Sequence, residues 1–172
     1  MATRERRLEN DYRALQRLCI QFESVKIKLL DKRGNPPEYY RIQLSNCKGV
    51  ESVIGNTPKY RTEHILIVGN FPKDYPDPGK LPTVKLETPM FHPNVFPDDG
   101  QFCFRGSDFE VINQPLDALI RRVIAMIQFE NLNFGVPANP EARDWANRNK
   151  QLFPLCSGSD VNSPSKPTLN WR

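Results

Sequence analysis

The spacing of apolar residues predicts a helix at the start of the chain, over residues 3–19. Leu8, Tyr12, Leu15 and Cys19 follow one another at steps of four, three and four residues, which places them on one helical face. Thr3 is of a type that caps helix starts. One side of this helix is therefore expected to pack against the rest of the protein.

After this helix the apolar period changes to two, which is typical of half-buried strands. Four strands are expected: residues 25–29, 40–44, 63–68 and 83–87. Residues 31–37 have the composition of a turn, and residues 45–61, with two glycines and a proline, are expected to form a long loop. Short strands with local connections favour an antiparallel meander that presents one face to a helix.

The stretch between Pro72 and Pro97 contains seven of the sixteen prolines. Proline fixes φ and lacks a backbone donor, so this stretch is predicted to be a stiff loop rather than a helix or a central strand. Loops held by a rigid scaffold commonly carry functional residues.

Two helices are predicted in the last third of the chain. The first opens at Pro115 and has a wide apolar face. Its apolar residues are Leu116, Leu119, Ile120, Val123, Ile124 and Ile127. The second begins at Asn139, with Pro140 in its first turn and Ala142, Trp145 and Ala146 facing inward. We expect one domain over residues 1–154 and a polar C-terminal tail over residues 155–172.

The composition fits one globular domain: 172 residues, of which 38% are hydrophobic and 26% charged. No apolar run approaches the ~20 residues that a bilayer span needs. The charged N-terminus lacks the pattern of a secretory signal, so a cytoplasmic protein without membrane attachment is expected.

The cysteines and histidines do not form a metal-binding pattern. The cysteines, at positions 19, 47, 103 and 156, have no C-x-x-C spacing, and only two histidines are present. We therefore expect thiols rather than disulfides, and no zinc site or other metal centre.

The net charge is +4, and the densest basic segment lies in the first helix. Its charged residues are Arg4, Arg6, Arg7, Arg13 and Arg17, interleaved with Glu5, Glu9 and Asp11. A solvated helix face is favoured over a nucleic-acid surface, which usually has an unbroken basic stripe. Docking to an acidic protein is a third interpretation.

Residues 92–103 bring together His92, Asn94 and Cys103. A cysteine thiolate is a nucleophile, and a side-chain amide can stabilise the oxyanion that forms during acyl transfer. His92 can hold the loop through its ring nitrogens, because Pro93 provides no backbone donor. Each residue alone is more commonly structural, so the interpretation depends on their combination.

Five segments resemble the ubiquitin-conjugating enzyme family. They are Phe71–Pro76, Leu81–Thr88, His92–Val95, Gly100–Cys103 and Pro137–Ala142. The resemblance covers roughly residues 3–153. It implies an α+β fold with an N-terminal helix, a four-stranded antiparallel meander, an active-site loop and C-terminal helices, and a catalytic domain over residues 1–154.

The resemblance also implies a role for each matching residue. Cys103 would accept ubiquitin or a ubiquitin-like protein from an activating enzyme as a thioester and pass it to a lysine amine. Asn94 would support the oxyanion or the loop, and His92 and Pro93 would hold the loop in shape.

The implied partners are all proteins: an activating enzyme, ubiquitin or a ubiquitin-like protein, and in some reactions a ligase. Arg4, Arg6 and Arg7 would meet an acidic surface of the activating enzyme. No cofactor, nucleic acid or membrane is implied.

Several positions depart from the family's usual pattern. The step from His92 to Cys103 is one residue longer, with the extra residue in the turn at 97–100. Phe104 and Arg105 replace the usual Leu-Asp, and the usual downstream Trp is absent. Asp77 and Val136 stand where a ligase-contacting apolar residue and a lysine-gating polar residue often lie. These departures favour a divergent member and are compatible with a prokaryotic source.

Two other hypotheses remain open. One is a non-catalytic module that binds a ubiquitin-like protein, although such modules generally lack the cysteine. The other is a cysteine hydrolase with His92 as its base, although in papain-like enzymes the cysteine usually precedes the histidine.

Overall fold

The computed structural model describes residues 3–130, 132 and 135–155 of the protein. Three α-helices, two short 3₁₀ helices and six strands follow one another in these residues. In chain order they are α1 (Thr3–Gln21), β1 (Lys26–Gly34), β2 (Pro37–Ser45), β3 (Gly49–Ile54), β4 (Thr57–Arg61), β5 (His64–Gly69), β6 (Thr83–Leu86), η1 (Gly106–Asn113), α2 (Leu116–Ile127), α3 (Pro140–Arg148) and η2 (Lys150–Leu152).

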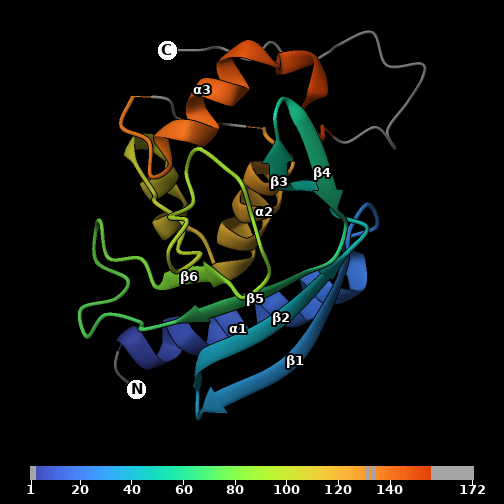
Figure 1. The fold of residues 1–172 in the computed structure, drawn as a ribbon. Helices are drawn as coiled ribbons and strands as arrows, with labels where there is room; N and C mark the ends of the chain where they lie inside the picture. The colour runs from blue at the N-terminus through green and yellow to red at the C-terminus, as the bar shows by residue number, and fades with distance from the viewer. Residues whose placement is uncertain (1–2, 131, 133–134, 156–172) are drawn as a thin grey trace, which may run out of the picture.

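The main sheet is the predicted four-stranded antiparallel meander. Its strand order is β1-β2-β5-β6, so consecutive strands of this sheet are neighbours. Helix α1 packs against β1 and β2 and also contacts α2. Helix α3 and the β3–β4 hairpin lie at the end of the molecule opposite α1 (Figure 1). The predicted α+β fold is confirmed.

The predicted loop over residues 45–61 is wrong, because this segment contains the β3–β4 hairpin. Ile54 pairs with Thr57, so the turn consists of Gly55 and Asn56, and Gly55 has a φ of 64°. Glycine adopts this conformation without steric cost. Pro58 lacks a backbone N–H. It is tolerated because the hairpin has only two strands, so the position of the missing donor can face away from the partner strand.

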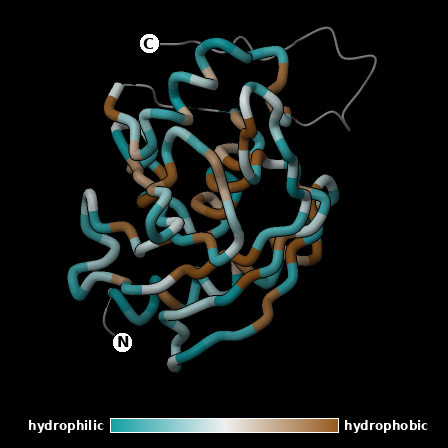
Figure 2. The backbone as a smooth tube through the Cα atoms, viewed as in Figure 1, coloured by the Kyte–Doolittle hydropathy of each residue, from teal (hydrophilic) through white to brown (hydrophobic). Residues whose placement is uncertain are grey.

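The predicted turn at residues 31–37 is also too long. Strand β1 continues to Gly34 and β2 starts at Pro37, which leaves only Asn35 and Pro36 in the turn. The charged residues there lie on an exposed edge strand, where charge discourages pairing with other chains. Figure 2 shows that this end of the hairpin is hydrophilic, whereas the inner strands and α2 carry the apolar positions.

The helices confirm the predicted periodicity. All six apolar residues listed for the helix after Pro115 are buried. The side chain of Asn139 caps α3 by accepting the N–H of Ala142 at 3.1 Å, and Trp145 is buried as expected. Of the predicted tail, only Leu155 is described, so the boundary at residue 154 stays a prediction.

The buried apolar residues form two groups. The larger fills the space between α1, the main sheet and α2. The smaller joins the β3–β4 hairpin to α3 through Val50, Phe129, Trp145 and Ala146. The loop before Cys103 contacts both groups, because Val95 and Phe102 belong to the larger one and the ring of His92 lies 4.8 Å from that of Phe129 in the smaller one.

Candidate active site

The segment from Asn94 to Cys103 folds back on itself as a small antiparallel loop. The backbone N–H of Cys103 donates to the carbonyl of Asn94 at 2.8 Å, and Val95 bridges Phe102. The N–H of Phe96 donates to the carbonyl of Gln101 at 2.9 Å. The two residues that the sequence proposed for acyl transfer therefore lie opposite each other at the open end of this loop.

The returning arm of the loop is attached to the edge of the main sheet. The N–H of Leu86 donates to the carbonyl of Gly100, and the N–H of Phe102 donates to the carbonyl of Val84, both at 2.9 Å. Gly100 has a φ of 76°, and a Cβ added there would lie 2.3 Å from the Leu86 carbonyl oxygen. Only glycine fits at this position, which explains its place three residues before Cys103.

His92 holds the loop from the protein interior, and both of its ring nitrogens form hydrogen bonds with backbone groups. Its Nδ1 accepts the N–H of Asn94 at 2.9 Å, and its Nε2 lies 2.6 Å from the carbonyl oxygen of Met126. The carbonyl requires Nε2 to carry the proton, so the ring is neutral with its tautomer fixed. The residue is fully buried, and burial lowers its pKa to about 4.

Pro93 connects the loop to the second motif of the sequence. Its carbonyl oxygen accepts the N–H of Ala138 at 2.8 Å and that of Asn139 at 3.1 Å. Because Asn139 also caps α3, the loop and the start of that helix are held as one unit. Two segments more than forty residues apart in the sequence thus build one site.

The Asn94 side chain is buried, with 1% of the residue exposed, whereas Cys103 is half-buried. The flanking Phe102 is buried, so the chain alternates at this point and turns the cysteine outward. Cys103 lines a hollow of about 280 Å³ that also includes Leu81, Phe96 and Phe104. A nucleophile must reach its substrate, and this exposure meets that requirement.

The residues after Cys103 form η1, which is held in place by an ion pair. Asp108 accepts the N–H of Arg105 at 2.8 Å, and its other oxygen lies 2.7 Å from the guanidinium of Arg122 on α2. The side chain of Asp108 is buried, and this pairing occupies both of its oxygens. Asp108 therefore holds the segment that follows Cys103 in place, and it does not face an incoming amine.

Val136 does not pack into the core: the residue is 57% exposed. It therefore does not serve simply to fill space against the central helix. No side chain that can accept a proton is present at this position, as the sequence indicates.

The predicted contact residues Arg4, Arg6 and Arg7 have different environments. Arg4 donates to the carbonyl oxygens of Phe71 and Pro72 and pairs with Glu38 at 2.7 Å. Only Arg6 is exposed, whereas the other two are half-buried. Arg6 is therefore the one of the three whose charge is directed mainly at solvent.

Arg7 belongs to a buried cluster around Asp11 that sequence reasoning missed. Asp11 is fully buried, although its place among charged residues indicated a solvated face. It accepts hydrogen bonds from Arg7 at 2.8 Å, the Tyr75 hydroxyl at 2.5 Å and the Leu116 N–H at 2.9 Å. Burial raises the pKa of this carboxyl despite the three donors.

The Asp11 cluster connects α1 to the segments on both sides of the active-site loop. Arg7 also donates to the carbonyl oxygens of Ile112, at 2.8 Å, and Gln114 at the end of η1. Tyr75 lies in the proline-rich stretch before the loop, and Leu116 starts α2. Only the step of three from Leu8 to Asp11 to Ala14 marks Asp11 as inward-facing in the sequence.

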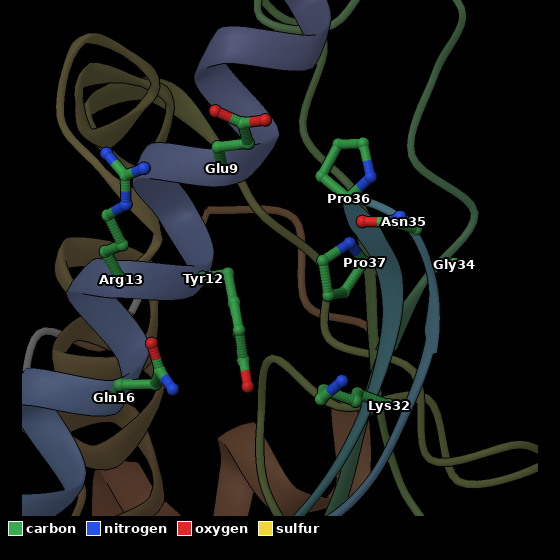
Figure 3. A pocket seen from close by; sticks show the side chains of 9 residues that line it. All are labelled: Glu9, Tyr12, Arg13, Gln16, Lys32, Gly34, Asn35, Pro36 and Pro37. Atoms are coloured by element: carbon green, nitrogen blue, oxygen red, sulfur yellow. The ribbon is translucent and has the colours of Figure 1, made fainter.

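A second hollow, of about 390 Å³, lies between α1 and the turn of the β1–β2 hairpin. Figure 3 shows Tyr12 between the helix, which also carries Glu9 and Arg13, and the hairpin residues Pro36 and Pro37. This hollow contains none of the residues from 92 to 103, so it is separate from the Cys103 site.

No group of three or more metal-ligating side chains occurs within the described residues. Cys19, Cys47 and Cys103 take part in no disulfide there, and Cys156 lies outside the described part of the chain. No helix in that part is long and apolar enough to cross a membrane.

Comparisons with known proteins identify the fold. No family model and no curated protein matches the chain. Among solved structures, one described as a novel ubiquitin-conjugating enzyme is 20% identical with a TM-score of 0.54, over 84% of this chain and 86% of that one. A protein of Trypanosoma cruzi described as a ubiquitin conjugating enzyme is 22% identical with a TM-score of 0.58, over 85% of this chain and 91% of that one.

The chain therefore has the fold of ubiquitin-conjugating enzymes, and the predicted resemblance is confirmed at the level of the fold.

Proposed function

We propose that this protein is a transferase that accepts ubiquitin or a ubiquitin-like protein from an activating enzyme as a thioester on Cys103 and transfers it to a lysine. The observation that carries the proposal is the pairing of a half-buried Cys103 with Asn94 across a loop of fixed shape. The likeness of the fold to ubiquitin-conjugating enzymes supports the same function.

Both proposed acyl transfers take place at the sulfur of Cys103. In loading, the Cys103 thiolate attacks the thioester carbonyl on the activating enzyme, a new C–S bond forms and the partner's thiolate leaves. In discharge, a neutral lysine amine attacks the Cys103 thioester, the C–N bond forms, the C–S bond breaks, and the amine proton passes to solvent. Both steps pass through a tetrahedral oxyanion, and the Asn94 amide is assigned as a donor to the oxyanion that forms during discharge to lysine.

The contacts of His92 count against a cysteine hydrolase. A base that deprotonates the thiol needs a ring nitrogen within hydrogen-bond reach of it. The Nδ1 of His92 is bonded to Asn94, and its Nε2 to Met126, in a fully buried position. The role that these contacts support is to hold the loop in shape.

The geometry around Cys103 favours catalysis over a purely binding role. Gly100, the backbone pairing of the loop and the Asp108–Arg122 pair all fix the chain immediately around the thiol. A binding module has no need for a cysteine held in this way at the mouth of a hollow. We propose a cytoplasmic enzyme that works with an activating enzyme, with or without a ligase.

The test is incubation with an activating enzyme, ATP and a ubiquitin-like protein, followed by electrophoresis with and without reductant. A reducible adduct supports conjugation. Cleavage of a fusion of the modifier supports a hydrolase, and binding without an adduct supports a module. Either of the last two results would overturn the proposal.

A further inference from the structure

The hollow that contains Cys103 is lined by uncharged residues only. Leu81, Phe96, Phe104 and Phe109 supply apolar surface around the thiol. Its volume of about 280 Å³ is enough for one or two side chains. Its polar side chains are those of Thr83 and Gln101, and no lining residue offers a charge to pair with, so the hollow favours uncharged occupants.

A larger hollow of about 630 Å³ lies on the other side of Phe96 and has the opposite character. Its charged members are three carboxylates, Glu87, Asp98 and Asp99, and one ammonium, Lys85. Glu87 pairs with Arg41, and Asp99 accepts the N–H of Gln101. Within the described residues, Asp98 and Asp99 form no ion pair.

Phe96 is the boundary between these two hollows and lines both of them. The residue is 40% exposed, which is high for a large apolar residue beside a candidate nucleophile. A chain that crosses Phe96 would meet an uncharged surface at Cys103 and an acidic surface beyond it. Such a chain needs an apolar segment and a basic segment side by side.

The order of the two surfaces suits a lysine acceptor. A lysine arrives as an ammonium, which the acidic hollow attracts, and it must become neutral before it attacks. Uncharged surroundings disfavour the charged form, so the hollow around Cys103 promotes that change. The aliphatic stem of lysine also fits an aromatic surface.

This inference rests on the proposed function. We propose that each acceptor lysine of this protein has an apolar residue next to it and a basic residue beyond that neighbour. The hollow at Cys103 binds the lysine stem and its apolar neighbour. The acidic hollow beyond Phe96 binds the basic residue.

The experiment is single-turnover discharge of the loaded protein to three peptides of equal length. The first has leucine on both sides of its lysine and arginines outside them. In the second, serines replace the leucines, and in the third, glutamates replace the arginines. We expect the first peptide to react about five- to thirtyfold faster than either of the others at low salt, and the advantage over the third to shrink as salt is added.

Two variants and a control locate the effect. Phe96→Ala should remove the preference for leucine, and Asp98→Asn should weaken the preference for arginine, each measured as a ratio of discharge rates between two peptides for the same loaded variant. Glu63→Gln removes an exposed carboxylate that lines neither hollow, and it should behave as the wild type. Thermal unfolding checks that each variant is folded.

Equal discharge rates for the three peptides would overturn this inference while leaving the proposed function intact. Slower loading in Phe96→Ala with normal discharge would also overturn it, because the hollow would then bind the modifier's tail. Absence of any adduct in the wild type would overturn the proposed function itself.

Discussion

The backbone amide of Cys103 donates a hydrogen bond of 2.8 Å to the backbone carbonyl of Asn94. This contact fixes the spacing between the thiol and a side-chain amide across the two arms of the loop. His92, two residues before Asn94, fixes one arm from the protein interior, and Gly100 attaches the other arm to the sheet. The loop is therefore positioned by contacts that involve the backbone, which leaves the Cys103 side chain available for chemistry.

Replacing Asn94 by alanine should slow discharge more than loading. If the amide donates to the oxyanion during attack by lysine, its loss costs about 2–4 kcal/mol, or roughly 10²–10³-fold in the single-turnover rate. Asn94→Asp keeps the size of the side chain but removes the donor, and should have a similar effect. Equal losses in both steps together with a lower melting temperature would instead make Asn94 a purely structural residue.

The stability of the protein should depend on His92 between pH 4 and 6.5. The native pKa of about 4 lies below the ordinary value of 6.5, so the unfolded chain binds a proton first as the pH falls. The contribution of the neutral His92 ring to the free energy of unfolding is fully present above pH 6.5. It decreases by about 3 kcal/mol as the pH approaches 4. Urea unfolding of the wild type and His92→Gln over this range measures the contribution.

His92→Gln should give a flatter dependence of the unfolding free energy on pH. Some dependence should remain, because burial also lowers the pKa of His64. Identical slopes for the two proteins would show that His92 is not buried as a neutral ring.

Arg6→Glu and Arg7→Glu should have different effects, because Arg6 is an exposed charge and Arg7 pairs with a buried carboxylate. Arg7→Glu places a second carboxylate beside the fully buried Asp11, and it should lower the free energy of unfolding by about 3–5 kcal/mol. Arg6→Glu should leave stability nearly unchanged and slow loading at low salt, because exposed charges act mainly on association. Similar stability losses in both variants would contradict this assignment, and unchanged loading in Arg6→Glu would remove Arg6 from the predicted contact.

Val136→Asp should speed discharge to free lysine. The exposed valine cannot accept a hydrogen bond, and Asp108, the one buried carboxylate after Cys103 among the described residues, is already paired with Arg122. Positioning or general-base help is typically worth about 10²–10⁴-fold, so even a poorly placed aspartate should give a measurable gain. Rapid discharge by the wild type, slowed by the substitution, would contradict the idea of a missing gate.

The fold and the loop motif could be predicted because they depend on local pattern. The apolar face of α2 and the cap at Asn139 follow from the spacing and type of nearby residues. The β3–β4 hairpin was missed because Gly55 and Pro58 resemble loop residues until the strand pairing is seen.

The long-range contacts of the site could not be predicted from local pattern. Two of the three donors that satisfy the buried Asp11, the Tyr75 hydroxyl and the Leu116 N–H, are distant from it in the sequence. The bond of His92 to the Met126 carbonyl likewise depends on how α2 packs behind the loop. Spacing along one element carries no information on such partners.

Intact-protein mass spectrometry after reaction with an activating enzyme, ATP and a ubiquitin-like protein tests the central claim most directly. The account predicts one added modifier, less one water, that thiol reductant removes from the wild type and from Cys19→Ser and Cys47→Ser. Cys103→Ser should give no adduct or one that resists reductant, and Cys103→Ala should give none. A full reducible adduct on Cys103→Ala would contradict the account.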